Sequence, residues 1–233
     1  MHLRENVRDT KNLRVVERKD SRGSGREGIL VTRNLVPGST VYGERVIMID
    51  GAPFREWDPF RSKLAAAILK GMRSDVIREG DRVLYLGTST GTTPSHISDI
   101  IGPSGILIGV ESSARVARDF VENVARLRKN VIPYLRDARD PEGYDTLGKV
   151  DIVYCDIAQP DQTEIAIANC QAHLKPGGQF LLVVKARSID VLKEPKKVFE
   201  AEKSKLLTAG FTLETLKELS PFDKDHAIIL AMF

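Results

Sequence analysis

The sequence predicts an α/β fold in which helices cover both faces of a mostly parallel sheet. Two observations lead to this prediction. Short β-branched runs alternate with helical stretches between residues 83 and 184, as in strands joined by helical crossovers. The chain has 233 residues with 42% hydrophobic and 29% charged content, which is typical of a globular protein with a sizeable core.

The first part of the chain, residues 1–55, is predicted to form a small antiparallel β module. Its strand candidates, separated by glycine- and proline-containing segments, are Leu13–Val16, Gly28–Val31 and Thr40–Ile49. The second part, residues 56–233, is predicted to hold the main sheet. It opens with a helix that we expect to start at Asp58-Pro59 and to end at Gly71, because aspartate, proline and glycine suit these helix termini.

Seven strand candidates follow in the second part. They are Val83–Leu86, Ile106–Val110, Val131–Leu135, Val150–Cys155, Gln179–Val184, Phe211–Leu216 and Ala227–Phe233. The predicted helices between them are Thr92–Ile101, Ala114–Leu127, Thr163–Leu174 and Pro195–Ala209. The link before the last strand, Ser220–Asp225, is short enough for an antiparallel hairpin. This order indicates the Rossmann-like fold of class I S-adenosylmethionine-dependent methyltransferases.

The first strand of the predicted sheet ends in a glycine-rich turn, Gly87-Thr88-Ser89-Thr90-Gly91-Thr92-Thr93. Ligands in doubly wound sheets bind at the carboxyl ends of strands, and glycines there let the backbone approach them. The spacing excludes a dinucleotide fingerprint, which needs G-x-G-x-x-G, and a P-loop, which needs G-K-[ST] after its second glycine. From this turn alone, a strand-to-helix connection without a ligand stays open.

Carboxylates follow the next two strands. Glu111 is placed to accept hydrogen bonds from both hydroxyls of an adenosine ribose, by the logic of the acidic residue in nucleotide-binding folds. Asp137, followed by Ala138, is placed to accept one from an adenine amino group. Either carboxylate alone could be surface charge. Three polar features at the ends of three successive strands instead indicate an adenosine-bearing ligand without a pyrophosphate, namely S-adenosylmethionine.

Three further segments lie at strand ends: Asp156-Ile157-Ala158-Gln159-Pro160-Asp161-Gln162, Val184-Lys185-Ala186 and Asp225-His226-Ala227. With the glycine-rich turn, they resemble fibrillarin, the RNA ribose 2′-O-methyltransferase of box C/D particles. The resemblance covers the chain from about residue 57 to the end and, more loosely, the N-terminal module. The resemblance implies a catalytic set around the ribose 2′-oxygen, formed by Lys63, Asp156, Lys185 and His226.

The resemblance also implies a cofactor and its contacts. The cofactor is S-adenosylmethionine, and no metal is expected. Its binding residues fall on Gly87, Thr88, Gly91, Thr92, Thr93, Glu111, Ser112, Asp137, Ala138, Asp156, Ile157, Ala158 and Gln159. Ser112 stands where the family often has an aromatic side chain.

Partners and location follow from the same resemblance. We expect box C/D guide RNA, target rRNA or tRNA, and a coiled-coil scaffold protein as partners, with no membrane. Eukaryotic members carry a long Gly/Arg-rich extension, and the short form here resembles the archaeal type. A cytoplasmic location is therefore expected rather than a nucleolar one.

The chemistry accounts for the residue types in the catalytic set. A ribose hydroxyl is a very weak acid, so its oxygen must lose or share its proton as it attacks the methyl group. Lys185 is predicted to act as the base or to stabilise the developing alkoxide. Asp156 would orient the lysine, and His226 would orient the substrate or relay a proton.

Other functions stay open at this point. They are a non-catalytic RNA-binding scaffold subunit that retains the fold, a nucleotide-dependent oxidoreductase, and a methyltransferase of small molecules or proteins. The net charge of +3 does not decide among them, although basic clusters such as Arg126, Arg128 and Lys129 occur. His96 and His173 are interpreted as surface or internally satisfied histidines, and Cys155 as a core residue.

Overall fold

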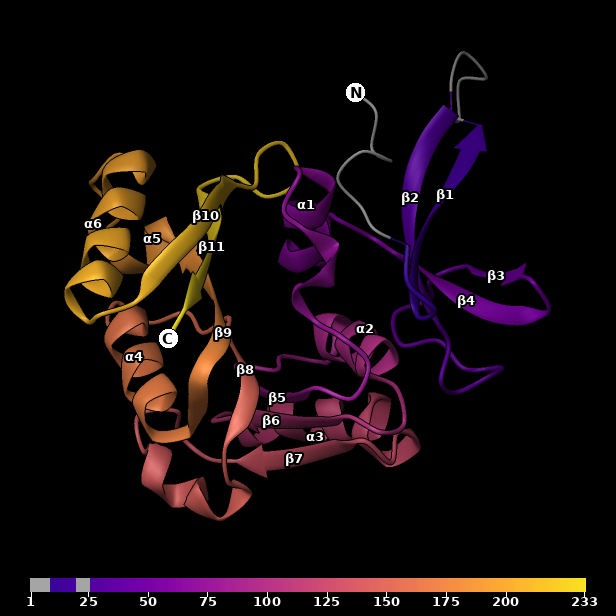
Figure 1. Cartoon of the computed structure of the whole chain (residues 1–233), viewed down its shortest axis with the longest axis horizontal. Coiled ribbons are helices and arrows are strands. Elements are labelled where there is room, and N and C mark those ends of the chain that lie inside the picture. The colour runs from indigo at the N-terminus through magenta and orange to yellow at the C-terminus, as the bar shows by residue number, and fades with distance from the viewer. Residues whose placement is uncertain (1–8, 20–25) are drawn as a thin grey trace.

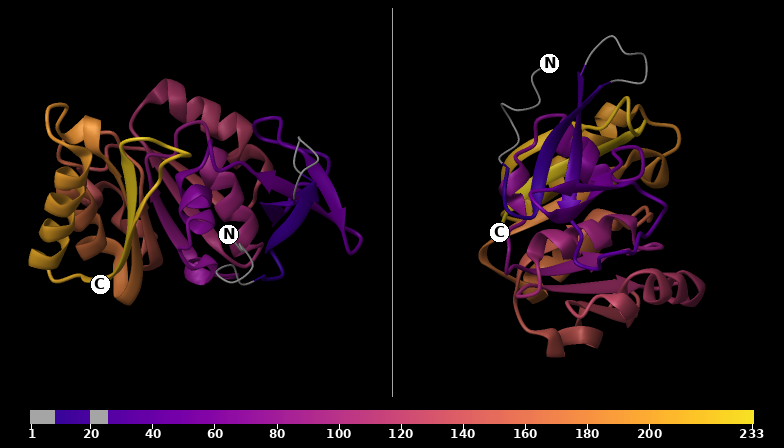
Figure 2. Two further views of the ribbon diagram at one scale, coloured as in Figure 1. Left: turned by 90° about the horizontal axis from the view of Figure 1, so that it is seen from above. Right: turned by 90° about the vertical axis from the view of Figure 1, so that its right-hand side faces the viewer.

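The computed structural model describes residues 9–19 and 26–233. It contains a four-stranded sheet near the N-terminus and a seven-stranded sheet that forms most of the molecule (Figure 1). The small sheet lies at one end, on the side of α1 and α2 and away from α4 and α6 (Figure 2). No helix in the described part of the chain has the length and apolar character needed to cross a membrane.

The small sheet is antiparallel, in the order β1-β2-β4-β3. Its strands are β1 (Leu13–Lys19), β2 (Arg26–Arg33), β3 (Val46–Ile49) and β4 (Ala52–Trp57). The predicted strand Thr40–Ile49 was wrong in its first half, because the Glu44 carboxylate accepts hydrogen bonds from the backbone N–H groups of Val41 and Tyr42 and holds a turn there. The sheet ends at Trp57, and the division of the chain into two domains at residues 55 and 56 stays a prediction.

The fourth strand, β4, was not predicted. It pairs with β3 across Asp50-Gly51, whose φ angles are 51° and 75°. Aspartate followed by glycine is a strong signal for a two-residue β-hairpin, because both residues tolerate positive φ. The sequence contains this signal directly after the predicted strand Thr40–Ile49.

Helix α1 (Lys63–Leu69) starts later than the predicted Asp58-Pro59. Its N-cap is Ser62, whose hydroxyl accepts a hydrogen bond from the backbone N–H of Ala65. Asp58 instead caps a local turn, with Oδ1 accepting from the N–H of Phe60 at 2.8 Å. Because α1 starts at residue 63, Lys63 lies in the first turn of the helix.

The large sheet has the strand order β10-β11-β9-β8-β5-β6-β7. Its strands are β5 (Arg82–Leu86), β6 (Ile106–Glu111), β7 (Val131–Leu135), β8 (Val150–Cys155), β9 (Leu174–Lys185), β10 (Thr212–Glu218) and β11 (His226–Met232). The pairings among β5, β6, β7, β8 and β9 are parallel, whereas β11 pairs antiparallel with both β9 and β10. The predicted seven-stranded sheet ending in an antiparallel hairpin is confirmed.

Helices pack on both faces of the large sheet. They are α2 (Thr92–Ile101), α3 (Ala114–Asn123), α4 (Gln162–His173), α5 (Ala186–Ile189) and α6 (Pro195–Thr208), with 3-10 turns at Ser74–Val76, Ala125–Leu127 and Pro141–Leu147. Side chains of β5 alternate between two buried layers: Val83 and Tyr85 join the layer under α1 and α2, and Leu84 and Leu86 the layer under α4 and α6. The chain runs outward from β5 in both directions, so the carboxyl end of β5 is a topological switch point.

A buried group of charges joins the small sheet to α2. We call Glu44, Arg55, Asp99 and Arg128 the interface cluster. The Arg55 guanidinium contacts Glu44 and lies 2.7 Å from Asp99, and Arg128 also pairs with Asp99. Arg128 is thus 5% exposed and does not belong to an exposed basic patch, which corrects the sequence interpretation.

The two histidines and the cysteine that were interpreted as structural residues are buried. His96 is fully buried, and its ring nitrogens lie 2.7 Å from Thr32 Oγ1 and 2.9 Å from Tyr42 Oη. His173 is also buried and contacts the carbonyl of Pro141. Both are internally satisfied histidines, and Cys155 is a fully buried core residue.

Candidate active site

A cavity of about 300 Å³ lies at the switch point, over the carboxyl ends of β5, β6, β7 and β8. Its walls include ten of the residues singled out from the sequence: Gly87, Glu111, Ser112, Asp137, Ala138, Asp156, Ile157, Ala158, Gln159 and Lys185. The parallel strands gather these residues because their carboxyl ends meet at the same edge of the sheet. The cavity is at the lower end of the volumes usual for ligand sites.

Glu111 is held by two backbone N–H groups, one from the glycine-rich turn and one from its own turn. Its Oε2 accepts a hydrogen bond from the N–H of Ser89 at 3.2 Å, and its Oε1 accepts one from the N–H of Ser113 at 3.0 Å. Each carboxylate oxygen can still accept a second hydrogen bond. The side chain is half-buried and lines the cavity, so it is held in one orientation with acceptor capacity left for two hydroxyls.

The glycine-rich turn brings backbone close to the cavity. Gly87 has φ +81°, and a Cβ atom there would lie 3.0 Å from the carbonyl oxygen of Asp156. Gly91, with φ +103°, is the N-cap of α2 and packs against Val124 and Phe120 with no space for a side chain. Both glycines are therefore required by the backbone conformation and by close packing.

Asp137 stands at the exposed rim of the cavity. Its Oδ1 accepts a hydrogen bond from the N–H of Arg139, and its side chain is 56% exposed. Arg139 was not singled out from the sequence. Its guanidinium donates to Gln159 Oε1 at 3.1 Å and pairs with Asp161 at 2.8 Å, so it bridges the rim between β7 and β8.

Four predicted cofactor-binding residues lie outside the cavity lining: Thr88, Gly91, Thr92 and Thr93. Thr88 is 1% exposed, and its hydroxyl has no hydrogen-bond partner among the described residues. The Thr93 hydroxyl donates to Ser62 Oγ at 2.9 Å and so ties the start of α2 to the N-cap of α1. Contacts of these four residues with a cofactor stay predictions.

The predicted catalytic residues come together next to this cavity. Lys185, the last residue of β9, places Nζ 2.8 Å from Asp156 Oδ1 and donates to the Asp156 carbonyl at 2.7 Å. Lys63 Nζ lies 3.4 Å from the same Oδ1. These carboxylate contacts are ion pairs rather than directed hydrogen bonds, since Oδ1 has no partner of hydrogen-bond geometry in the described chain.

His226 comes from the strand next to β9 and lines a neighbouring hollow rather than the cavity itself. It is the first residue of β11 and stands directly opposite Lys185 in the antiparallel β9–β11 ladder. Its Nδ1 lies 2.6 Å from the carbonyl of Lys224 and 2.7 Å from Asp223 Oδ1. Nδ1 therefore carries the proton toward these acceptors, which leaves Nε2 available for another group.

Asp223 was missed by the sequence analysis. It lies in the connection between β10 and β11, and its Oδ2 is 4.0 Å from Lys63 Nζ. Burial alone would raise its pKa, but the hydrogen bond from His226 and the charges of His226, Lys63 and Lys185 hold the pKa below its ordinary value. Its position only three residues before His226 was the available signal.

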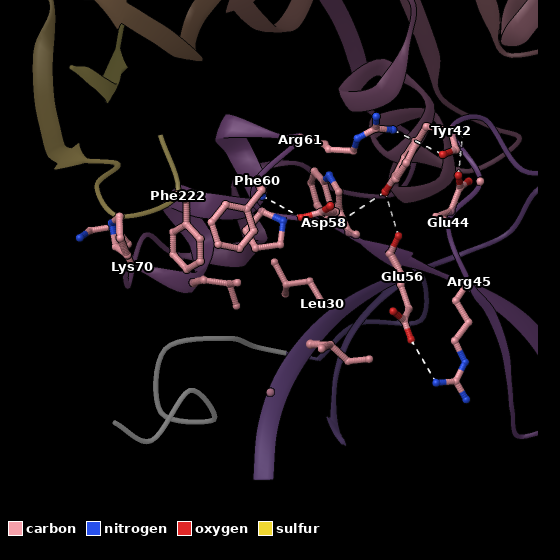
Figure 3. A pocket seen from close by; sticks show the side chains of 17 residues that line it. Leu30, Tyr42, Glu44, Arg45, Glu56, Asp58, Phe60, Arg61, Lys70 and Phe222 are labelled. Atoms are coloured by element: carbon pink, nitrogen blue, oxygen red, sulfur yellow. Dashed lines mark hydrogen bonds and ion pairs between the residues drawn. The ribbon is translucent and has the colours of Figure 1, made fainter. Parts of the chain in front are cut away.

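A second cavity, of about 710 Å³, is larger than the one at the switch point. It lies between the small sheet, α1 and the β10–β11 connection, and Figure 3 shows Phe60 and Phe222 side by side on its wall. Among residues 9–19 and 26–233, no three His, Cys, Asp or Glu side chains gather so as to hold a metal ion.

Comparison with known proteins identifies the family. The family model Fibrillarin matches residues 12–233. The chain is 53% identical over 205 residues to the fibrillarin-like rRNA/tRNA 2′-O-methyltransferase of Saccharolobus islandicus, covering 88% of each protein. The chain belongs to the fibrillarin family. Because the match begins at residue 12, the small N-terminal sheet is part of the fibrillarin-family chain.

Two solved fibrillarin structures extend the comparison. Aeropyrum pernix fibrillarin, in complex with natively bound S-adenosyl-L-methionine, has 47% sequence identity and a TM-score of 0.84, over 94% of each chain. A fibrillarin/Nop5p complex matches with 42% identity and a TM-score of 0.78, over 88% of this chain and 94% of that chain. The predicted methyltransferase fold is confirmed.

Proposed function

We propose that this fibrillarin-family chain transfers the methyl group of S-adenosylmethionine to the 2′-hydroxyl of ribose in rRNA and tRNA. One observation supports this proposal above the others. Lys63, Asp156, Lys185 and His226 gather next to a cavity whose wall already contains Asp156 and Lys185. Asp156 and Lys185 thus belong both to the candidate catalytic set and to the wall of the cavity that we assign to the cofactor.

The cavity residues fit an adenosine-bearing cofactor. Glu111 is oriented by two backbone N–H groups and would accept hydrogen bonds from the ribose hydroxyls. Asp137 at the rim would accept one from the adenine amino group, and Gly87 leaves room where a Cβ would crowd the chain. When bound, S-adenosylmethionine supplies a methyl group that its positive sulfonium makes electrophilic.

The lysines and Asp156 would act on the ribose hydroxyl. Asp156 holds Lys185 Nζ through both its carboxylate and its carbonyl, at the border of the cavity. From there, Lys185 would take the proton of the 2′-hydroxyl or stabilise the negative charge that develops on its oxygen. Lys63 adds a second positive charge beside the same carboxylate. His226 would orient the substrate or accept the proton at Nε2.

The partners are part of the proposal. The relative in complex with Nop5p suggests a scaffold protein for this chain as well, and the curated relative's name suggests rRNA and tRNA as substrates. We further propose that a box C/D guide RNA selects the target nucleotide in a cytoplasmic particle. Base pairing would then read the sequence, while this chain performs the chemistry.

Methyl transfer from radiolabelled S-adenosylmethionine tests the proposal. The chain is incubated with a target RNA, a matching box C/D guide RNA, the scaffold protein and the other particle protein. We expect label at the 2′-oxygen of one nucleotide, located by resistance of the adjacent phosphodiester to alkaline hydrolysis. A guide shifted by one nucleotide should shift the label by one nucleotide.

Three other outcomes would contradict parts of the proposal. No transfer by the complete particle, despite cofactor binding, would favour the non-catalytic scaffold function. Efficient transfer to bare RNA by the isolated chain would contradict the dependence on partners. Transfer to protein or to small molecules in place of RNA would contradict the substrate.

A further inference from the structure

Asp223 links the four predicted catalytic residues into one continuous chain of side-chain contacts. The order of contacts is Lys185, Asp156, Lys63, Asp223 and His226, with separations of 2.8, 3.4, 4.0 and 2.7 Å. Without Asp223, His226 would have no carboxylate within ion-pair distance in the described part of the chain. The side chain is 31% exposed, so it is neither a core residue nor a freely solvated one.

The connection that carries Asp223 is anchored on the helix that carries Lys63. Phe222 packs edge-on against Phe60, with ring centroids 5.2 Å apart at 70° (Figure 3). Lys70, just past the other end of α1, donates to the carbonyl of Ser220 at 2.5 Å. The connection is therefore attached near both ends of α1, and Asp223 lies one residue beyond the aromatic contact.

We infer that Asp223 is a positioning residue that fixes the imidazole of His226 and the ammonium of Lys63 relative to each other. The inference rests on the proposed function and deepens it. A carboxylate at Nδ1 holds an imidazole in one orientation and one tautomer, and the Lys224 carbonyl supports the same tautomer. Asp223 adds what the carbonyl lacks, namely a negative charge shared with Lys63.

Several other charged groups surround His226 and bear on any test of Asp223. Lys185 faces it from β9, and its own connection supplies Lys224 and Asp225. The hollow next to the ring is also lined by Glu194, Lys196 and Glu218, from the start of α6 and the end of β10. Of the carboxylates named here, Asp223 is the one within ion-pair distance of the imidazole.

A kinetic test uses Asp223→Asn in the complete particle. Single-turnover methylation at saturating cofactor should slow by about 10- to 100-fold, less than the 10²–10⁴-fold typical of losing a general acid or base. Cofactor affinity and thermal melting should stay unchanged, and Asp223→Glu should recover part of the rate. In Asp223→Asn/His226→Gln, the losses should not multiply, because one residue acts through the other.

The matched control is Asp50→Asn, which makes the same chemical change at an exposed pair with Arg14 and should leave the rate unchanged. A rate for Asp223→Asn within threefold of the parent would overturn the inference while leaving the proposed function intact. Fully multiplicative losses in the double variant would also overturn it. A parent particle that transfers no methyl group would instead contradict the proposed function.

A second measurement does not depend on activity. Carboxyl carbon NMR should find the pKa of Asp223 below its ordinary value in the parent protein, because His226 donates a hydrogen bond to it and Lys63 lies near. Replacing His226 by Gln, or Lys63 by Met, should raise this pKa in each case. If neither replacement changes the titration, the carboxylate is not coupled to the two catalytic candidates, and the inference is wrong.

Discussion

This protein contains two clusters of charged side chains that differ in their exposure to solvent. In the interface cluster, the side chains of Glu44, Arg55, Asp99 and Arg128 are 0–3% exposed. In the candidate catalytic chain, Lys63, Asp156, Lys185, Asp223 and His226 are 13–31% exposed. Both clusters consist of paired opposite charges, so pairing alone does not distinguish structure from function.

The two clusters also differ in how many partners surround each charged side chain and in whether that side chain lines a cavity. Arg55 donates to Glu44, Ser95 and Asp99, and Asp99 in turn accepts from Thr32, Leu35 and Arg128. Each of the four charges of the interface cluster is thus paired with an opposite charge inside the protein. The Lys185 ammonium instead makes its hydrogen bond and its ion pair with one described residue, Asp156, and its side chain lines a cavity. Charges that are saturated hold a structure together, whereas charges left open beside a cavity are candidates for chemistry.

The largest effect on stability is expected from removing one partner of the buried ion pairs in the interface cluster. Arg55→Met should lower the free energy of unfolding by about 3–5 kcal/mol, because it leaves Glu44 and part of Asp99 buried without their partner. Guanidinium denaturation measures the change. Arg126→Met, which breaks an exposed pair with Glu122, is the control and should cost less than about 1 kcal/mol. Similar losses for both variants would show that the interface cluster is not structural.

A substitution of Glu111 tests whether the cavity at the switch point binds the cofactor. Glu111→Ala should weaken S-adenosylmethionine binding by about 1–3 kcal/mol, or about 5- to 150-fold, because hydrogen bonds to both ribose hydroxyls are lost. Calorimetry gives the affinity, with Glu122→Ala on the exposed face of α3 as the control. An unchanged affinity for Glu111→Ala would rule out its assignment as the ribose-binding residue.

A smaller effect should appear with pH, through the histidine beside the interface cluster. Burial and the charges of Arg55 and Arg128 hold the pKa of His96 well below 6.5. Below pH 6.5 the unfolded chain therefore takes up a proton at this residue that the folded chain excludes, so stability falls as pH falls, by at most about 1.4 kcal/mol per pH unit. Denaturation at pH 7.5 and 5.5 should show a loss of about 1 kcal/mol that is absent in His96→Asn. An equal loss in this variant would assign the pH dependence to other groups.

Local patterns predicted most of the large sheet. Helix α2 and strands β7 and β8 have the bounds expected from the sequence, because apolar runs and glycine stops define them without reference to the rest of the chain. The prediction was wrong where two local signals competed. Asp58-Pro59 has the form of a helix start, but Ser62 is the N-cap that the structure uses.

Charged residues also differ in whether their roles could be predicted from the sequence. Glu111, Asp137, Asp156 and Lys185 were found because each lies at a strand end or within two residues of one, and parallel strands bring these ends together. Arg128 and Asp223 could not be interpreted in this way. A charged residue on a helix end or a connection acquires its role from a distant partner, Asp99 in one case and Lys63 in the other, and no periodicity records such pairs.

Lys185→Ala tests most directly whether the candidate catalytic chain performs the methyl transfer. Single-turnover methylation of guided target RNA at saturating cofactor is measured for this variant beside thermal melting of the same preparation. We predict that the rate falls by about 10²–10³-fold while the melting temperature and the cofactor affinity stay close to those of the parent, since the interaction is made mainly in the transition state. A rate within about threefold of the parent would contradict the account and make Lys185 a structural residue like those of the interface cluster.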